Sequence, residues 1–164
     1  MDRPSLYDDD IVTWAEEQAV ALGALAARPD LSNTVDRENV AEEIESVGPS
    51  RVQAVESLLA QVLCHLLKQL SVPIARANLH WRQETLAFHA AARTRCVGSM
   101  RRRIHWDQVW KLSQVMAESG LLPYGDMLIP RLPTECPITP DELLAESLDI
   151  DSALKRIVGA AGSH

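Results

Sequence analysis

The chain has 164 residues, of which 46% are hydrophobic and 24% are charged, and its formal net charge is −7. This length favours a single domain over residues 1–164 with one sizeable core. No apolar run reaches the roughly 18 residues that a membrane-spanning helix requires, and the first residues lack the pattern of a secretory leader. We therefore expect a soluble, cytoplasmic protein that does not enter a membrane.

Charge is distributed unevenly along the sequence. Residues 1–50 carry 12 acidic and 3 basic side chains, residues 51–111 carry 3 acidic and 10 basic, and residues 112–164 carry 8 acidic and 3 basic. This order suits a fold whose acidic ends pack beside its basic middle, within one chain or across a dimer. Because nucleic-acid-binding domains are usually basic as a whole, nucleic acid is not the expected partner.

The cysteines predict no cross-link or zinc site. Cys64, Cys96 and Cys136 are odd in number, far apart, and form no C-x-x-C pair. A disulfide scaffold and a structural zinc site are both poorly supported by this pattern. A reduced protein is the simplest interpretation.

The first predicted helix covers residues 8–27. Its apolar side chains fall on one arc at about 100° per residue, and Gln18 lies in the middle of that arc. Pro29 ends the helix, because a proline disfavours the helical conformation in the residue before it. An unsatisfied buried amide costs about 1–3 kcal/mol, so we expect Gln18 to hydrogen-bond a neighbouring helix in a structural role.

Two helices are predicted on either side of Gly48-Pro49, over residues 36–48 and 50–71. Gly48 is well placed to end the first of them in a left-handed conformation. The second is the most hydrophobic element, with leucine and valine over close to half its circumference, so we expect it to be the central helix. The short link between the two predicts a tight antiparallel hairpin.

The next elements are a helix over residues 75–95, a break at Val97-Gly98, and a helix over residues 107–119 that Gly120 closes. Four prolines then make residues 121–138 an extended connection over the surface.

The C-terminal part begins with a strong helix-start signal. Thr139 and Glu142 form a capping box, and Pro140 occupies the first helical position. A short last helix is predicted over residues 151–158, followed by a frayed tail over residues 159–164.

Strand signals are almost absent, so the expected fold class is all-α. We predict a single-domain bundle of about five main helices plus a short C-terminal helix, with the proline-rich connection packed against it. The alternative is two separate subdomains, which would unfold in two transitions.

The second predicted helix carries a cluster of carboxylates. Asn39 and Glu43 lie one turn apart, where their oxygens are candidate ligands for a divalent cation. The alternative is a solvated acidic face. Glu42 and Glu45 have the E-x-x-E spacing of all-α nucleotide pyrophosphohydrolases, but the later helix supplies only Glu56, so the second carboxylate pair of that site is missing.

His65 and Lys68 are the candidate polar residues of the central helix. His65 lies at the edge of the leucine arc, where an imidazole can pack its ring and direct one nitrogen at a carboxylate. It is either a hydrogen-bonded core residue or a metal ligand. We expect Glu43 to lie near the predicted turn, and His65 to contact a group on the first or fourth helix, in two separate polar contacts.

Five central arginines straddle the break at Val97-Gly98. They offer positive charge to a phosphate, or pair with the acidic helices of the chain: Arg93, Arg95, Arg101, Arg102 and Arg103. No phosphate loop, nucleophile elbow or helical zinc motif occurs, and no nucleophile–base pair is identifiable, so the catalytic residues are unknown and no cofactor is predicted.

Several of these residues belong to a longer pattern. The run from Asn39 to Gly48, N-V-A-E-E-I-E-S-V-G, is followed by His65-Leu66-Leu67-Lys68 and later by Glu135-Cys136-Pro137. Together they resemble the bacterial family catalogued as domain of unknown function 29. The resemblance covers nearly the whole chain and implies a small α-helical protein with no established activity. The polar residues shared with the family correspond to Gln18, Asn39, Glu43, His65 and Lys68.

The function expected from the sequence is that of a non-enzymatic helical module for protein interaction or self-association. The absence of catalytic motifs and the segregated charge favour this interpretation, with itself or another protein as the partner. The alternative is a metal-dependent or phosphate-handling enzyme that uses Glu43 and His65. A stoichiometric metal in protein purified without an affinity tag would favour that alternative.

Overall fold

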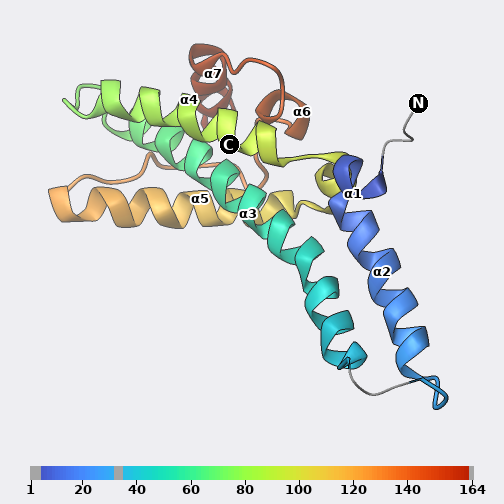
Figure 1. Cartoon of the computed structure of the whole chain (residues 1–164). Coiled ribbons are helices and arrows are strands. Elements are labelled where there is room, and N and C mark those ends of the chain that lie inside the picture. Colours follow the sequence, from blue (N-terminus) through green and yellow to red (C-terminus); the bar gives the residue numbers. More distant parts are fainter. Residues whose placement is uncertain (1–4, 32–34, 163–164) are drawn as a thin grey trace. The chain divides into compact units, whose positions relative to one another are not determined.

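The computed structural model describes residues 5–31 and 35–162, and every regular element in these ranges is helical (Figure 1). The all-α fold class is therefore confirmed. The chain forms two compact units, which we call unit 1 (Met1–Ala54 and Cys96–Ile104) and unit 2 (Val55–Arg95 and His105–His164). The expectation of a single domain stays a prediction.

Unit 1 contains α1 (Leu6–Asp9), α2 (Ile11–Ala26), the first half of α3 (Arg37–Ser71) and the 3₁₀-helix η1 (Gly98–Arg103). The first helix predicted from the sequence is thus two helices, divided at Asp10, whose side chain caps α2 by accepting from the Thr13 backbone N–H at 3.2 Å. A carboxylate at this position satisfies a backbone donor that the first helical turn leaves unpaired.

Asp10 also holds η1 against the start of α2. Its carboxylate accepts hydrogen bonds from the Ser99 backbone N–H at 2.9 Å and from the Ser99 hydroxyl at 3.1 Å. The break at Val97-Gly98 is confirmed: Gly98 has φ +55°, and a Cβ there would lie 2.5 Å from Cγ of Asp10. Only glycine fits both this backbone conformation and this close approach.

The predicted helix end at Gly48, and with it the hairpin of helices over residues 36–48 and 50–71, is wrong. The chain passes through Gly48-Pro49 as one 35-residue helix, α3. Gly48 is buried, and a Cβ there would meet Cγ1 of Val12 at 3.0 Å. The glycine therefore provides room for the close approach of α2. Pro49 is exposed, so water can reach the carbonyl that its missing N–H leaves unpaired.

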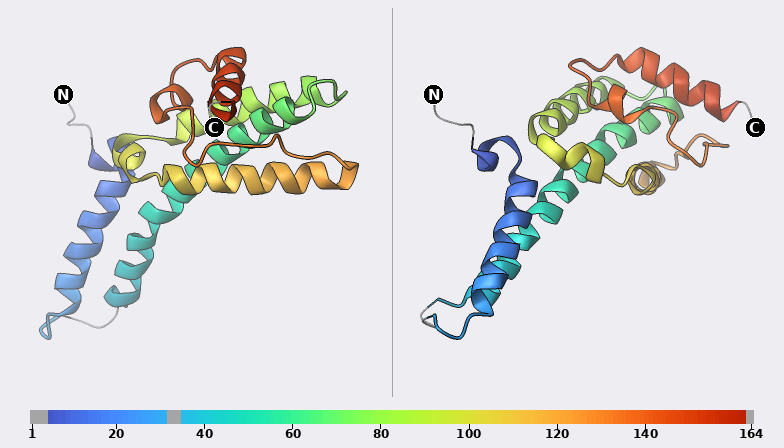
Figure 2. Two further views of the ribbon diagram at one scale, coloured as in Figure 1. Left: turned by 180° about the vertical axis from the view of Figure 1, so that it is seen from behind. Right: turned by 90° about the vertical axis from the view of Figure 1, so that its right-hand side faces the viewer.

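The second half of α3 supplies the core of unit 2, as its predicted apolar face suggested. Beside it lie α4 (Asn78–Arg95) and α5 (Trp106–Leu121), and Glu56 of α3 accepts from the His105 backbone N–H at 2.7 Å where α5 begins (Figure 2). Six valine and leucine side chains of α3 are at most 1% exposed: Val55, Leu59, Val62, Leu63, Leu66 and Leu67.

The predicted helix end at Gly120 is also wrong, because α5 continues to Leu121. A Cβ at Gly120 would lie 2.5 Å from Nζ of Lys68, so this glycine leaves space for the lysine of α3. The left-handed residue comes later, at Gly125 (φ +75°), after the short 3₁₀-helix η2 (Leu122–Tyr124).

The proline-rich connection packs against α3 and α5 of unit 2. The Ile129 backbone N–H donates to the Ser71 hydroxyl at 3.1 Å, and the Trp110 indole N–H donates to the Pro133 carbonyl at 2.9 Å. Such hydrogen bonds satisfy polar groups where the irregular backbone of the connection forms no regular hydrogen-bond pattern. The connection is confirmed, except that its first residues form η2.

The capping box of Thr139 and Glu142 is confirmed at the start of α6 (Pro140–Leu143). The last helix, α7 (Ile150–Ala161), is longer than predicted and includes residues expected in a frayed tail. Its apolar side chains Ile150, Ala153 and Ile157 are buried, which fixes the helix against the rest of unit 2. Residues 163–164 of the predicted tail lie outside the described residues.

Candidate functional site

A polar cluster lies where α3 and α4 meet in unit 2. Glu84 of α4 stands between two histidines: its Oε2 lies 3.3 Å from Nε2 of His65 on α3, and its Oε1 lies 3.3 Å from Nε2 of His80. The exposed fractions of the side chains are 9% for His65, 34% for Glu84 and 66% for His80. The cluster thus leads from a buried imidazole to one at the surface.

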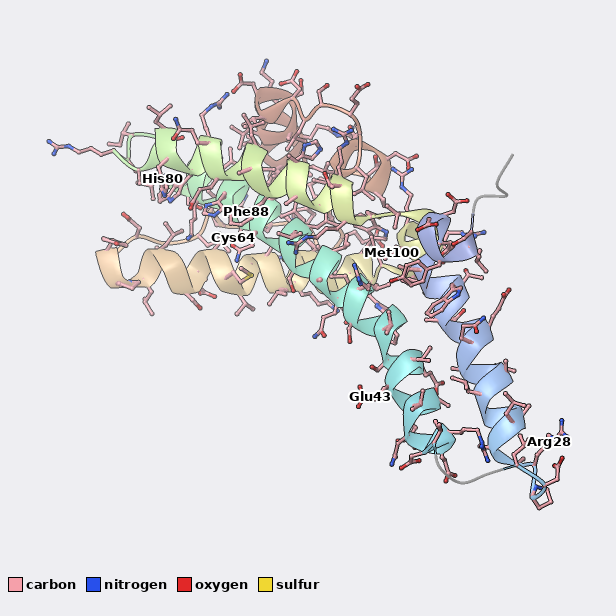
Figure 3. The ribbon with its side chains drawn as sticks, in the orientation of Figure 1. Arg28, Glu43, Cys64, His80, Phe88 and Met100 are labelled. Carbon is pink, nitrogen blue, oxygen red and sulfur yellow. The ribbon has the colours of Figure 1, made fainter. Side chains whose placement is uncertain are left out.

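Helical spacing brings the α4 members of this cluster together. His80, Glu84 and Phe88 are each four residues apart, so they follow one another along one face of α4. The Phe88 ring stacks on the His65 ring, with centroids 5.6 Å apart and planes 6° apart. Figure 3 labels His80 and Phe88 on α4 and Cys64 on α3. Aromatic stacking and the carboxylate together fix the position of the His65 ring.

One turn further along α3, the buried side-chain amide of Gln69 makes a second polar contact with α4. The Gln69 side-chain N–H₂ donates to the His65 carbonyl at 3.1 Å and to the Thr85 hydroxyl at 3.2 Å, and Thr85 donates to the Trp81 carbonyl at 2.7 Å. Such bonds between buried groups tie α3 and α4 in one register.

Burial disfavours the charged form of the His65 imidazole. It lowers the pKa of His65; the attraction of Glu84 opposes this shift, and the positive charges of Lys68 and His80 add to it. Nε2 faces Glu84, and the other nitrogen, Nδ1, is buried and has no hydrogen-bond partner among the described residues. The site therefore has no acceptor for a second proton on this ring.

The thiols show no sign of nucleophilic activation. All three cysteines are free, and burial raises the pKa of Cys64 and of Cys96, and that of Cys136 to about 11. Because the thiolate is the reactive form, these thiols are poorly suited to covalent catalysis.

The structure does not bring the predicted metal ligands together. Asn39 and Glu43 are exposed in unit 1, where the Asn39 amide donates to Oδ2 of Asp36 at 2.6 Å and the Ser46 hydroxyl donates to the Glu43 carbonyl at 2.8 Å. His65 belongs to unit 2 and meets Glu84 of the fourth predicted helix, as expected. Within residues 5–31 and 35–162, no three His, Cys, Asp or Glu side chains are grouped to hold a metal ion.

The other carboxylates in the first half of α3 face solvent, which agrees with the alternative of a solvated acidic face. Glu38, Glu42 and Glu45 are exposed and line an open groove of about 360 Å³ between α2 and α3 of unit 1. Gln18 of α2 is half-buried and makes no hydrogen bond within the described residues, so the bond expected for it is not seen. The buried amide of the fold is instead Gln69.

Two of the central arginines are used internally. Arg103 pairs with Glu16 within unit 1, its Nη2 lying 2.8 Å from the carboxylate, and Arg93 donates to the Glu146 carbonyl at 2.7 Å within unit 2. The Glu16 carboxylate thus balances the charge of Arg103, whereas the partner of Arg93 is an uncharged backbone carbonyl.

The sequence interpretation missed Glu84, His80 and Asp10. The signal for the first two was present, because His80, Glu84 and Phe88 share one face of α4. Their meeting with His65 depends on how α3 and α4 pack, which spacing alone does not give. Asp10 precedes α2 directly, and its partner Ser99 is 89 residues away.

Comparisons with known proteins agree with this fold. The family model described as domain of unknown function DUF29 matches residues 6–148. A crystal structure of an α-helical protein of unknown function from Rhodospirillum rubrum is similar with a TM-score of 0.84 and 28% identity, covering 95% of this chain and 99% of that chain. No curated protein matches. No helix of the described residues is long and apolar enough to span a bilayer. The chain belongs to the family of domain of unknown function DUF29.

Proposed function

We propose that this protein is a non-enzymatic helical module that associates with a second copy of itself through α5. The observation that carries the proposal is an exposed row of large apolar side chains. Leu112 is 44% exposed, Val115 59% and Leu122, directly after α5, 72%. Exposed apolar surface of this kind, when it is contiguous, is typical of protein interaction sites.

The spacing of the row suits helix–helix contact. Positions 112, 115 and 122 follow one another by three and seven residues, so they fall on one stripe of a helix, in the pattern of a coiled-coil seam. The opposite face of α5 is used inside unit 2, where Val109, Trp110 and Ala117 are at most 1% exposed. The exposed row is therefore not part of the core of unit 2.

The polar cluster supports an interaction role over an enzymatic one. The nitrogen of His65 and the amide of Gln69 are directed at groups of α4, which holds two helices together. The raised pKa values of the cysteines leave no activated thiol. Complete burial of a fully exposed large apolar side chain offers about 1.5–3 kcal/mol. These three side chains are partly exposed and each offers a share of that value, which is enough to contribute to association.

Light scattering on a size-exclusion column tests the proposal. The full chain is expected to elute with a mass above the 18.1 kDa of one copy. The double substitution Leu112→Ser, Val115→Ser removes two of the three side chains of the row and is expected to return the mass to that of one copy. Val20, which is 75% exposed on α2, provides the matched control, and Val20→Ser should leave the mass unchanged.

Two results would contradict the proposal. One is a mass of a single copy for the full chain at every concentration. The other is a larger mass that the double substitution and its control change equally, since the row would then have no special part in association.

A further inference from the structure

The polar cluster of α3 and α4 has one exposed and one buried end. The His80 ring is largely exposed to water, whereas the His65 ring is enclosed and stacked on Phe88. Glu84 contacts both rings, with one carboxylate oxygen directed at each. A single carboxylate therefore links a surface histidine to a buried one.

The hydrogen-bond geometry accommodates neutral rings. Each oxygen of Glu84 lies 3.3 Å from Nε2 of one histidine, so Nε2 is the ring nitrogen that faces the carboxylate in both contacts. A further proton on His65 would have to sit on Nδ1, where no described residue accepts it.

We propose that His65, Glu84 and His80 form an acid-sensitive latch, which holds α4 against α3 while His65 is neutral and loosens that contact when His65 takes up a proton. The charge of His80 adds to this effect, because it disfavours a charged His65. The latch belongs to unit 2 and does not depend on self-association.

The neighbouring charges set the direction of the pH response. Besides Glu84 and His80 from α4, the charged group acting on His65 is Lys68 of α3, which also disfavours the imidazolium; Cys64 beside it is kept as a thiol by burial. The pKa of His65 is lowered in the folded state, so the open state binds more protons. Stability of the contact is complete above about pH 6.5, the ordinary histidine value, and falls as the pH drops below it.

Amide hydrogen exchange of the full chain tests the latch. After correction for intrinsic exchange rates, amides of α4 around residue 84 are expected to lose up to about tenfold in protection per pH unit below pH 6.5. Amides of α7 serve as an internal reference. Ring resonances should show His65 neutral for as long as the α3–α4 contact persists.

Three variants separate the latch from general acid sensitivity. His65→Gln should remove the pH dependence around residue 84. Glu84→Gln should deepen the acid loss, because Glu84 alone favours the imidazolium. His105→Gln is the matched control: His105 is 62% exposed and also contacts a glutamate, Glu56 at 3.0 Å, yet it should leave the response of α4 unchanged.

Protection around residue 84 that is equal at pH 7.5 and 5.5 would overturn the latch, as would an unchanged pH response in His65→Gln. If His65→Gln does not fold, the wild-type ring resonances decide. A His65 ring that becomes protonated while α4 keeps full protection contradicts the proposal, and a ring that becomes protonated only as protection falls supports it.

Discussion

At the scale of single residues, two glycines show that the need for glycine can come from backbone conformation and from packing against distant residues. Gly98 adopts φ +55° and has Asp10 close against it, whereas nothing lies within 4 Å of a Cβ built at Gly23. Both positions are glycine in the sequence, yet only position 98 requires a residue without a side chain. The difference comes from the contact between Gly98 and Asp10. These residues lie 88 positions apart, so local sequence patterns do not reveal the contact.

These two glycines give a matched pair of substitutions. Gly98→Ala is expected to lower the free energy of unfolding by at least about 2 kcal/mol, because a side chain there is strained and collides with Asp10. Gly23→Ala lies inside α2 and should raise it by up to about 1 kcal/mol through helix propensity. Urea unfolding followed by circular dichroism measures both. Equal effects of the two substitutions would show that the Asp10–η1 contact does not form in solution.

At the scale of elements, signals that are complete within a few residues were predicted correctly, and signals that depend on packing were not. The capping box of Thr139 and Glu142 needs only four neighbouring residues, and it is present. Gly48-Pro49 has the local pattern of a helix end, but the helix continues through both residues, and Gly48 leaves room for Val12 of α2. His65 was identified as a polar group of the core, whereas its partner Glu84 follows only from the packing of α4 on α3.

Pro49 inside α3 provides a second test. Pro49→Ala should raise the free energy of unfolding by about 1–3 kcal/mol, since alanine restores the missing backbone donor and removes the steric conflict with the preceding turn. Pro140 is the control, because it occupies a favourable first position of α6, and Pro140→Ala should not stabilise. Thermal unfolding compares the two. A loss of stability in Pro49→Ala would mean that α3 is not continuous at this point.

At the scale of the whole molecule, some acidic side chains and some large apolar side chains stay exposed after the helices have packed. The acidic side chains Glu38, Glu42 and Glu45 stay exposed in unit 1, and the apolar row of α5 stays exposed in unit 2. The uneven charge was visible in the sequence. The exposed row was not, because the sequence alone does not tell whether an apolar side chain such as Leu112 or Val115 is buried or exposed.

The most direct measurement of the central claim is methyl NMR of the full chain at increasing protein concentration. Self-association through α5 predicts that the methyl resonances of Leu112, Val115 and Leu122 shift or broaden together with concentration, while those of Val20 on α2 stay constant. Resonances of the row that do not change with concentration, or that change no more than those of Val20, would contradict the account.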